Sequence, residues 1–92
     1  MNRVTESELQ SIVDRINRIC GTPDKPYVNG NSQVGNYHLG FAYGGVELQQ
    51  MENESGGVRT PLGCGHVTKR ELRDRMHAFI SGLYEKQEAK AS

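Results

Sequence analysis

Residues 37–52 read YHLGFAYGGVELQQME, and the predicted architecture is built around this stretch. Apolar and polar side chains alternate on both sides of a glycine pair, as they do in strands whose two faces differ. Gly44 and Gly45 supply a two-residue turn that accepts positive φ angles. The stretch therefore predicts a β-hairpin. The predicted cross-strand pairs are Tyr43 with Val46, Phe41 with Leu48, Leu39 with Gln50 and Tyr37 with Glu52.

Helices are predicted on both sides of this hairpin, over residues 5–20 and 68–84, because apolar side chains recur there at steps of three and four. The first stripe is Leu9, Ile12, Val13, Ile16, Ile19 and Cys20. The second stripe is Leu72, Met76, Phe79, Ile80 and Leu83. Capping boxes mark the two starts, Thr5 with Glu8 and Thr68 with Glu71. Residues 85–92 lose the periodicity and are expected to fray.

The connecting segments add short strands. Tyr27 and Val28 precede an Asn-Gly turn, and residues 58–60 favour a third strand of the sheet before Pro61 stops it. Two helices with one apolar stripe each match a sheet with one apolar face when both helices pack on that face. The sequence thus predicts one α+β domain over residues 1–84, a two-layer sandwich in the order α-β-β-(β)-α.

The composition of the chain narrows the classes of function that are expected. Eleven basic and eleven acidic residues cancel, so the chain lacks the global positive field of a dedicated nucleic-acid or membrane-surface protein. Two cysteines are too few for a disulfide framework. The polar start MNRVTESELQ has no secretory signal, and no apolar stretch reaches the roughly 18–20 residues that cross a bilayer. We expect a cytoplasmic protein without a membrane partner.

The second face of the predicted hairpin is expected to be bare, because both helices are used on the first. Small and polar side chains make up this outer face: His38, Gly40, Ala42, Glu47, Gln49 and Met51. These six residues are candidates for binding another protein, or a second copy of the chain in a homodimer. An open strand edge would allow association by strand addition. Simple solvation of the face is the alternative that the sequence leaves open.

A basic cluster marks the start of the second predicted helix, in the stretch GCGHVTKRELR at residues 63–73. Lys69, Arg70 and Arg73 add their charges to the partial positive charge of a helix N-terminus, which favours an anion there. Glu71 and Asp74 would neutralise much of this cluster. The pattern therefore indicates either an anion-binding site or a capped and solvated helix start.

The same stretch resembles the glycine-flanked loop and S/T-K-K-x-A-K helix start of double-stranded RNA-binding domains. The order of elements is similar as well. The resemblance implies that Lys69, Arg70 and Arg73 would grip phosphates, and His66 in the preceding loop belongs to this candidate site. Nucleic-acid binding is therefore the alternative function.

Residues 35–83 resemble small proteins of tailed-phage and prophage genomes. The shared features are a G-x-Y-x-L-x-x-A-Y-G-G hairpin, an N-E-x-G-G turn and a K-R-E-L helix start. The resemblance implies a viral accessory protein, a class that includes regulators and inhibitors of host machinery. Its partner would be a host or viral protein, and its location the host-cell cytoplasm.

Catalytic and metal-binding patterns are weak in this sequence. Cys64 and His66 have no second ligand pair at zinc-finger spacing, and His77 falls between core positions of the second predicted helix. The glycines fit turns rather than a P-loop or a dinucleotide fingerprint. We therefore expect no enzyme, no cofactor and no metal, but a protein that acts by binding a macromolecule.

Overall fold

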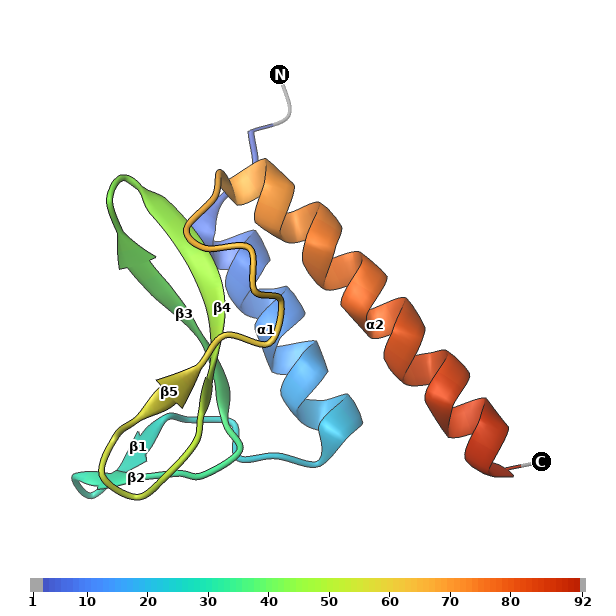
Figure 1. The fold of residues 1–92 in the computed structure, drawn as a ribbon, viewed down its shortest axis with the longest axis horizontal. Helices are drawn as coiled ribbons and strands as arrows, with labels where there is room; N and C mark the ends of the chain where they lie inside the picture. Colours follow the sequence, from blue (N-terminus) through green and yellow to red (C-terminus); the bar gives the residue numbers. More distant parts are fainter. Residues whose placement is uncertain (1–2, 92) are drawn as a thin grey trace.

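The computed structural model describes residues 3–91, with side chains described for residues 3–86. Helix α1 (Glu6–Cys20) comes first, five strands follow, and helix α2 (Lys69–Ala91) ends the chain. The strands are β1 (Tyr27–Val28), β2 (Asn31–Ser32), β3 (Tyr37–Ala42), β4 (Gly45–Met51) and β5 (Val58–Arg59). Both helices lie on the same side of the β3–β4 hairpin (Figure 1). The predicted α+β two-layer sandwich is confirmed.

The strands form two antiparallel sheets. The main sheet has the order β3-β4-β5, and β1 pairs with β2 in a separate two-stranded ribbon. The strand predicted at Tyr27 and Val28 and the third strand predicted near residue 58 are therefore both present. Beyond β5 the chain returns to β4, where Val46 and Val67 exchange two backbone hydrogen bonds of 2.9 Å. This bridge fixes the segment before α2 onto the hairpin.

The turn of the hairpin differs from the predicted one. The observed pairs are Ala42 with Gly45, Phe41 with Val46, Leu39 with Leu48 and Tyr37 with Gln50. The turn residues are Tyr43 and Gly44, with φ angles of 55° and 75°, so the prediction of a Gly44-Gly45 turn is wrong. Gly45 is needed in the strand instead, because a Cβ there would lie 3.0 Å from backbone atoms of His66 and Val67.

The corrected register is shifted by two residues, since Phe41 pairs with Val46 instead of Leu48. A shift of two keeps every side chain on its predicted face, because the period of a strand is two. The apolar face therefore still meets the helices. Tyr37 on this face is buried and Leu39 is half-buried, whereas Phe41 is 53% exposed.

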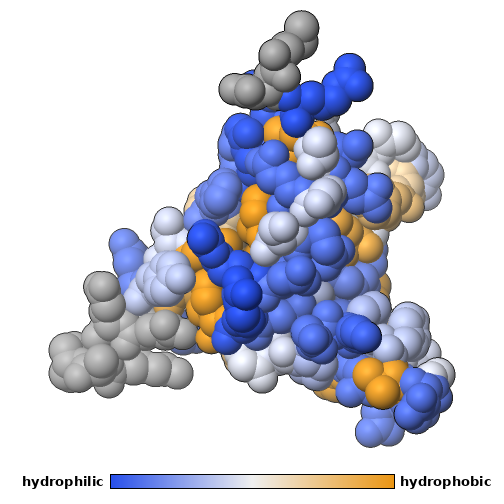
Figure 2. Space-filling view, turned by 180° about the vertical axis from the view of Figure 1, so that it is seen from behind, coloured by the Kyte–Doolittle hydropathy of each residue, from blue (hydrophilic) through white to orange (hydrophobic). Residues whose placement is uncertain are grey.

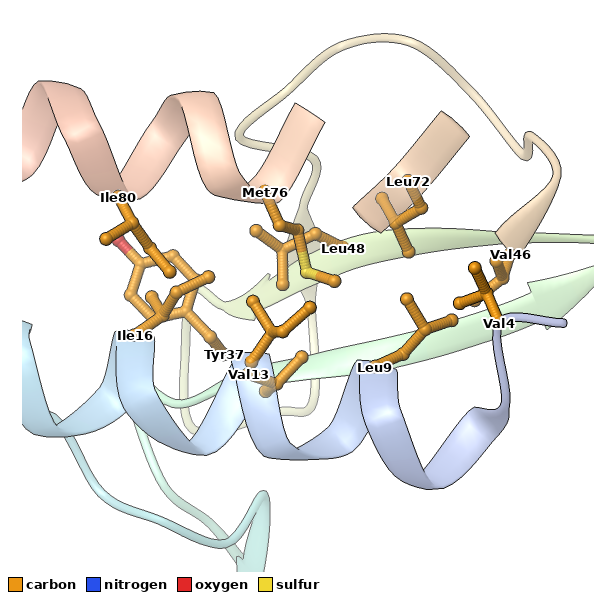
Figure 3. Packing of buried hydrophobic residues seen from close by; sticks show 11 residues of the cluster. Val4, Leu9, Val13, Ile16, Tyr37, Val46, Leu48, Leu72, Met76 and Ile80 are labelled. Atoms are coloured by element: carbon orange, nitrogen blue, oxygen red, sulfur yellow. The ribbon is translucent and has the colours of Figure 1, made fainter. Parts of the chain in front are cut away.

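The core lies between the hairpin and the two helices (Figure 3). Leu48 of β4 points toward Met76 of α2, and Val13 of α1 lies beside them. Tyr37 of β3 packs on Phe79, with ring centroids 5.9 Å apart. The buried hydrophobic residues of this cluster are Val4, Leu9, Ile12, Val13, Ile16, Tyr37, Val46, Leu48, Leu72, Met76 and Ile80.

One buried residue of α1 is polar and escaped the sequence prediction. Asn17 is 1% exposed and lies within the apolar stripe. Its Nδ2 donates to the carbonyl of Tyr37 at 3.0 Å, and its Oδ1 accepts from the N–H of Tyr37 at 2.8 Å. The hydroxyl of Thr22 donates to the same oxygen at 2.8 Å. Asn17 therefore pairs with β3 as a neighbouring strand would, and it ties α1 to the sheet.

Both helices begin at the threonine caps that the sequence predicts. The hydroxyl oxygens of Thr5 and Thr68 each accept from the backbone N–H three residues later at 3.1 Å. Helix α2 continues through residues 85–91, where the sequence predicted fraying, and residue 92 of the predicted tail lies outside the described residues. Neither of the two described helices combines the length and apolar character that a membrane crossing requires.

Candidate functional site

The most exposed aromatic side chain among the described residues, Tyr43, lies at the hairpin tip, which we define as residues 41–46. Tyr43 is 97% exposed, and its φ of 55° lies in the left-handed region. Phe41 stays half-exposed because the hairpin projects beyond the sheet region that the helices cover (Figure 1). Seen from behind, the lobe at upper right is mostly white and pale orange, whereas most of the helix surface is blue (Figure 2). The tip is therefore less hydrophilic than the surface of the helices.

A pocket of about 340 Å³ adjoins the tip. Its walls are mostly apolar or backbone, and it is lined by Phe41, Ala42, Gly44, Gly45, Val46, Val67 and Lys69. Lys69, at the first position of α2, is the only charged residue in this lining. The pocket therefore offers apolar contact with one cation at its edge, which suits a ligand side chain that is apolar or carries a single negative charge.

The loop before α2 is attached to the tip by side chains as well as by the Val46–Val67 bridge. The Nε2 of His66 lies 3.5 Å from the Oε1 of Glu47, to which the Nε2 of Gln49 donates at 2.8 Å. The rings of His66 and Tyr43 make an edge contact with centroids 5.7 Å apart. Glu47 is only 7% exposed. The His66 side chain thus holds the loop against the outer face of the hairpin.

The four residues predicted to bind nucleic acid do not share one environment. His66 faces Glu47, as described above. Arg73 lies 3.1 Å from the carboxylate of Asp74 and 3.9 Å from that of Glu8. Lys69 and Arg70 are exposed at the start of α2. Carboxylates of the chain itself therefore compete with a phosphate at His66 and Arg73.

The expectation of a bare outer face is wrong for two of its six residues. Glu47 is buried under the His66 loop, and Met51 is 2% exposed. Met51 lies between β5, with which it pairs, and residues 35–36, whose backbone groups hydrogen-bond to it at 2.8 Å. The His66 loop thus covers the face at Glu47, and the backbone of Met51 is paired on both of its edges.

The other four residues of the outer face are half-buried: His38, Gly40, Ala42 and Gln49. The Nδ1 of His38 lies 3.1 Å from the Oδ1 of Asn36. The amide of Gln49 occupies the space that a side chain at Gly40 would fill. These contacts leave only a narrow part of the face open, so it is a poorer binding surface than the hairpin tip.

Groups with potential for chemistry are scattered. Cys20 and Cys64 are both free thiols and half-buried. Burial raises the pKa of the Tyr37 hydroxyl, and the neighbouring Cys20 raises it further. Among the described residues, no three His, Cys, Asp or Glu side chains are grouped as metal ligands would be. His77 is exposed on α2 beside a shallow groove between the helices.

Comparisons with known proteins add no family to this picture. The chain matches no protein-family model, and no curated protein or solved structure is significantly similar to it. The geometry of the chain itself must therefore carry any functional argument.

Sequence reasoning did not single out Tyr43 or the pocket. The preference of tight turns for glycine assigned Gly44 and Gly45 to the turn and placed Tyr43 in a strand. The pattern Ala-Tyr-Gly-Gly is compatible with either turn, since both registers keep the same faces. The close approach of His66 and Val67 to Gly45 favours the register that exposes Tyr43.

Proposed function

We propose that this chain is a small non-catalytic accessory protein, of the phage type that its sequence resembles, and that it binds a host or viral protein through the hairpin tip. Its place of action in this proposal is the cytoplasm of the host cell. One observation carries the proposal: Tyr43 is held almost fully exposed in a left-handed backbone conformation.

The conformation of Tyr43 is costly in the free protein. A residue with a Cβ in the left-handed region is destabilised by about 1 kcal/mol or more, and asparagine or glycine usually occupies this turn position. Exposed tyrosine gains little from its contact with His66, which leaves most of the ring in solvent. Tyrosine is enriched among residues that dominate protein-binding energy, because it is large, rigid and partly polar. A binding role accounts for a residue that the fold alone disfavours.

The surroundings of Tyr43 fit the same role. Phe41 provides a second exposed aromatic ring, and the pocket lined by Val46, Val67 and Lys69 lies next to it. An apolar centre bordered by polar groups is typical of protein interfaces. The bridge between Val46 and Val67 keeps the pocket walls in place before any partner arrives, which lowers the entropy cost of binding.

Replacing Tyr43 by asparagine is expected to stabilise the protein and to weaken partner binding. Asparagine tolerates positive φ and forms the favoured Asn-Gly turn, so the melting temperature should rise by about 3 °C. Loss of a central tyrosine should reduce affinity by about thirtyfold or more. Thermal unfolding followed by circular dichroism measures the first effect. Affinity capture from host-cell lysate with quantitative mass spectrometry measures the second.

The matched control is Tyr84→Asn, which removes a 48% exposed tyrosine from α2, far along the chain from the tip. A protein retained by the wild type and by Tyr84→Asn, but not by Tyr43→Asn, supports the proposal. The same retained proteins with all three baits would contradict it, because the tip would then make no contribution to binding.

Nucleic-acid binding is the second candidate function, and one observation favours it. Lys69 and Arg70 are exposed at the capped start of α2, and Lys69 shares a pocket with the tip that carries Tyr43. Basic side chains beside an exposed aromatic ring are the elements that bind phosphates and stack bases. The carboxylates that face His66 and Arg73 argue against a larger phosphate-binding surface.

If this second function holds, replacing Lys69 and Arg70 together by alanine should weaken binding of duplex RNA or single strands by about tenfold or more at low salt. Fluorescence anisotropy with labelled duplexes and single strands at two salt concentrations measures the effect. The control is Arg75→Ala, because Arg75 is bound to Glu71 at 3.1 Å on the same helix. Absence of binding by the wild type at low salt would eliminate this function.

A further inference from the structure

The edge of β3 carries backbone groups that point away from the hairpin. Val46 directs its N–H and carbonyl to Val67, so its partner Phe41 forms a pair without mutual hydrogen bonds. The N–H and carbonyl of Phe41 therefore point outward from the sheet. Tyr37 has the same orientation, and Asn17 occupies both of its groups. Because orientation alternates along a strand, Leu39 points outward as well.

Leu39 and Phe41 are the two positions of β3 where this edge is open. Among the described residues, their outward N–H and carbonyl groups have no hydrogen-bond partner. Figure 1 shows β3 as the outer strand of the hairpin near the tip, with no helix or strand beyond it. Asn17 closes the edge at one end and the turn at Tyr43 closes it at the other.

This open edge lacks the devices that keep edge strands apart. Monomeric proteins protect such edges with charged residues, proline or bulges. The sequence of β3 is YHLGFA, which contains no lysine, arginine, acidic residue or proline, and its pairing with β4 runs without a bulge. Phe41, 53% exposed, adds an apolar side chain to the edge. The edge is therefore suited to pairing with another strand.

We propose that two copies of this chain associate through their β3 edges, in antiparallel register about a two-fold axis at Gly40. In this register Leu39 of one copy pairs with Phe41 of the other, and the reverse pair follows by symmetry. Each pair exchanges two hydrogen bonds, so all four free groups of each copy find partners. In this register the edge is complementary to itself, so a second copy of the chain fits it. Other registers of two copies leave some of these backbone groups unpaired.

The side chains agree with this arrangement. Phe41 packs against Leu39 of the second copy on the helix side of the sheet, which covers the exposed ring. The two glycines at position 40 meet in the close, non-hydrogen-bonded pair at the axis, where side chains would be nearest to each other. The shared edge is short, so the association is expected to be weak and concentration-dependent. This inference goes beyond the proposed partner binding and does not depend on it.

Sedimentation equilibrium over about 10 µM to about 1 mM protein tests the association. The wild type should shift from monomer to dimer across this range. Phe41→Lys should weaken dimerisation by about tenfold or more, because it places a charge in each strand pair. The matched control Tyr84→Lys, which also exchanges a half-exposed aromatic residue for lysine, should dimerise like the wild type. Tyr43→Asn should also still dimerise, which separates this inference from the proposed function.

Amide hydrogen exchange of the wild-type protein provides a second measurement that needs no variant. The amides of Leu39 and Phe41 should exchange more slowly as concentration rises, whereas the amide of Tyr43 in the turn should not change. A protein that remains monomeric at every concentration overturns the inference. A dimer that forms equally well with Phe41→Lys, or without concentration-dependent protection of Leu39 and Phe41, excludes β3 as its interface.

Discussion

Replacing Asn17 by alanine is expected to destabilise the fold by about 3 kcal/mol, because it leaves buried groups without partners. Asn17 satisfies both backbone groups of Tyr37 and the hydroxyl of Thr22. Alanine removes all three hydrogen bonds, and the Tyr37 groups remain in a region that solvent hardly reaches. For a chain of 92 residues, total stability should be about 5–14 kcal/mol, so this loss is a large fraction.

Urea denaturation followed by far-UV circular dichroism measures this loss, since the chain has no tryptophan for fluorescence. The control is Gln10→Ala on the same helix. It removes an exposed amide that donates to Asp14 at 3.0 Å and should change stability by less than about 0.5 kcal/mol. A loss below about 1 kcal/mol for Asn17→Ala would show that water or a local shift satisfies Tyr37 without the asparagine.

Replacing Leu48 by alanine is expected to cost about 2–5 kcal/mol, because it creates a cavity where the sheet meets both helices. Leu48 is 1% exposed, and its side chain points toward Met76 of α2 with Val13 of α1 beside them (Figure 3). Leu48 packs in the cluster formed with both helices, so the cavity lies on the helix side of β4. The same urea titration measures the effect.

Leu48→Met is the matched control, since methionine nearly conserves the volume and should cost less than about 1.5 kcal/mol. Phe79→Ala offers a comparison at the border of the core, where the ring of Phe79 contacts Tyr37 and is partly exposed. Phe79→Ala should reduce the free energy of unfolding by less than the same substitution at a fully buried phenylalanine. Equal losses for Leu48→Ala and Leu48→Met would contradict a cavity as the cause.

The predicted binding sites illustrate the difference between a pattern and a surface. The sequence predicts that Lys69, Arg70 and Arg73 form a cluster, because charges that are close in sequence at a helix start are close in space. Whether Arg73 is available depends on Glu8, which belongs to another helix. Strand alternation predicts the outer face, but Glu47 is covered by the His66 loop, whose path the alternation does not describe, and Met51 is buried as well. The charges of neighbouring elements and the paths of loops are long-range properties.

The exposure of the hairpin tip is likewise not predictable from local sequence patterns. Strand alternation places Tyr43 on the apolar face of the predicted hairpin. In the structure it is instead the most exposed aromatic side chain among those described. Its exposure follows from a shift in register that leaves the hydrophobic pattern unchanged. The local turn preference favours the Gly44-Gly45 register, so the observed register depends on contacts with a segment far along the chain.

Local sequence patterns are sufficient to predict the α+β class, the two helix starts and the faces of the hairpin strands. These features depend on neighbours in sequence: the capping threonines Thr5 and Thr68 act within one turn, and alternation acts within one strand. Three other features appear only in the packed fold: the hairpin register, the burial of Glu47 and the pairing of Asn17 with Tyr37. Each of these depends on contacts between segments far apart in the chain, whose free energy is set only when the helices, the loops and the sheet pack together.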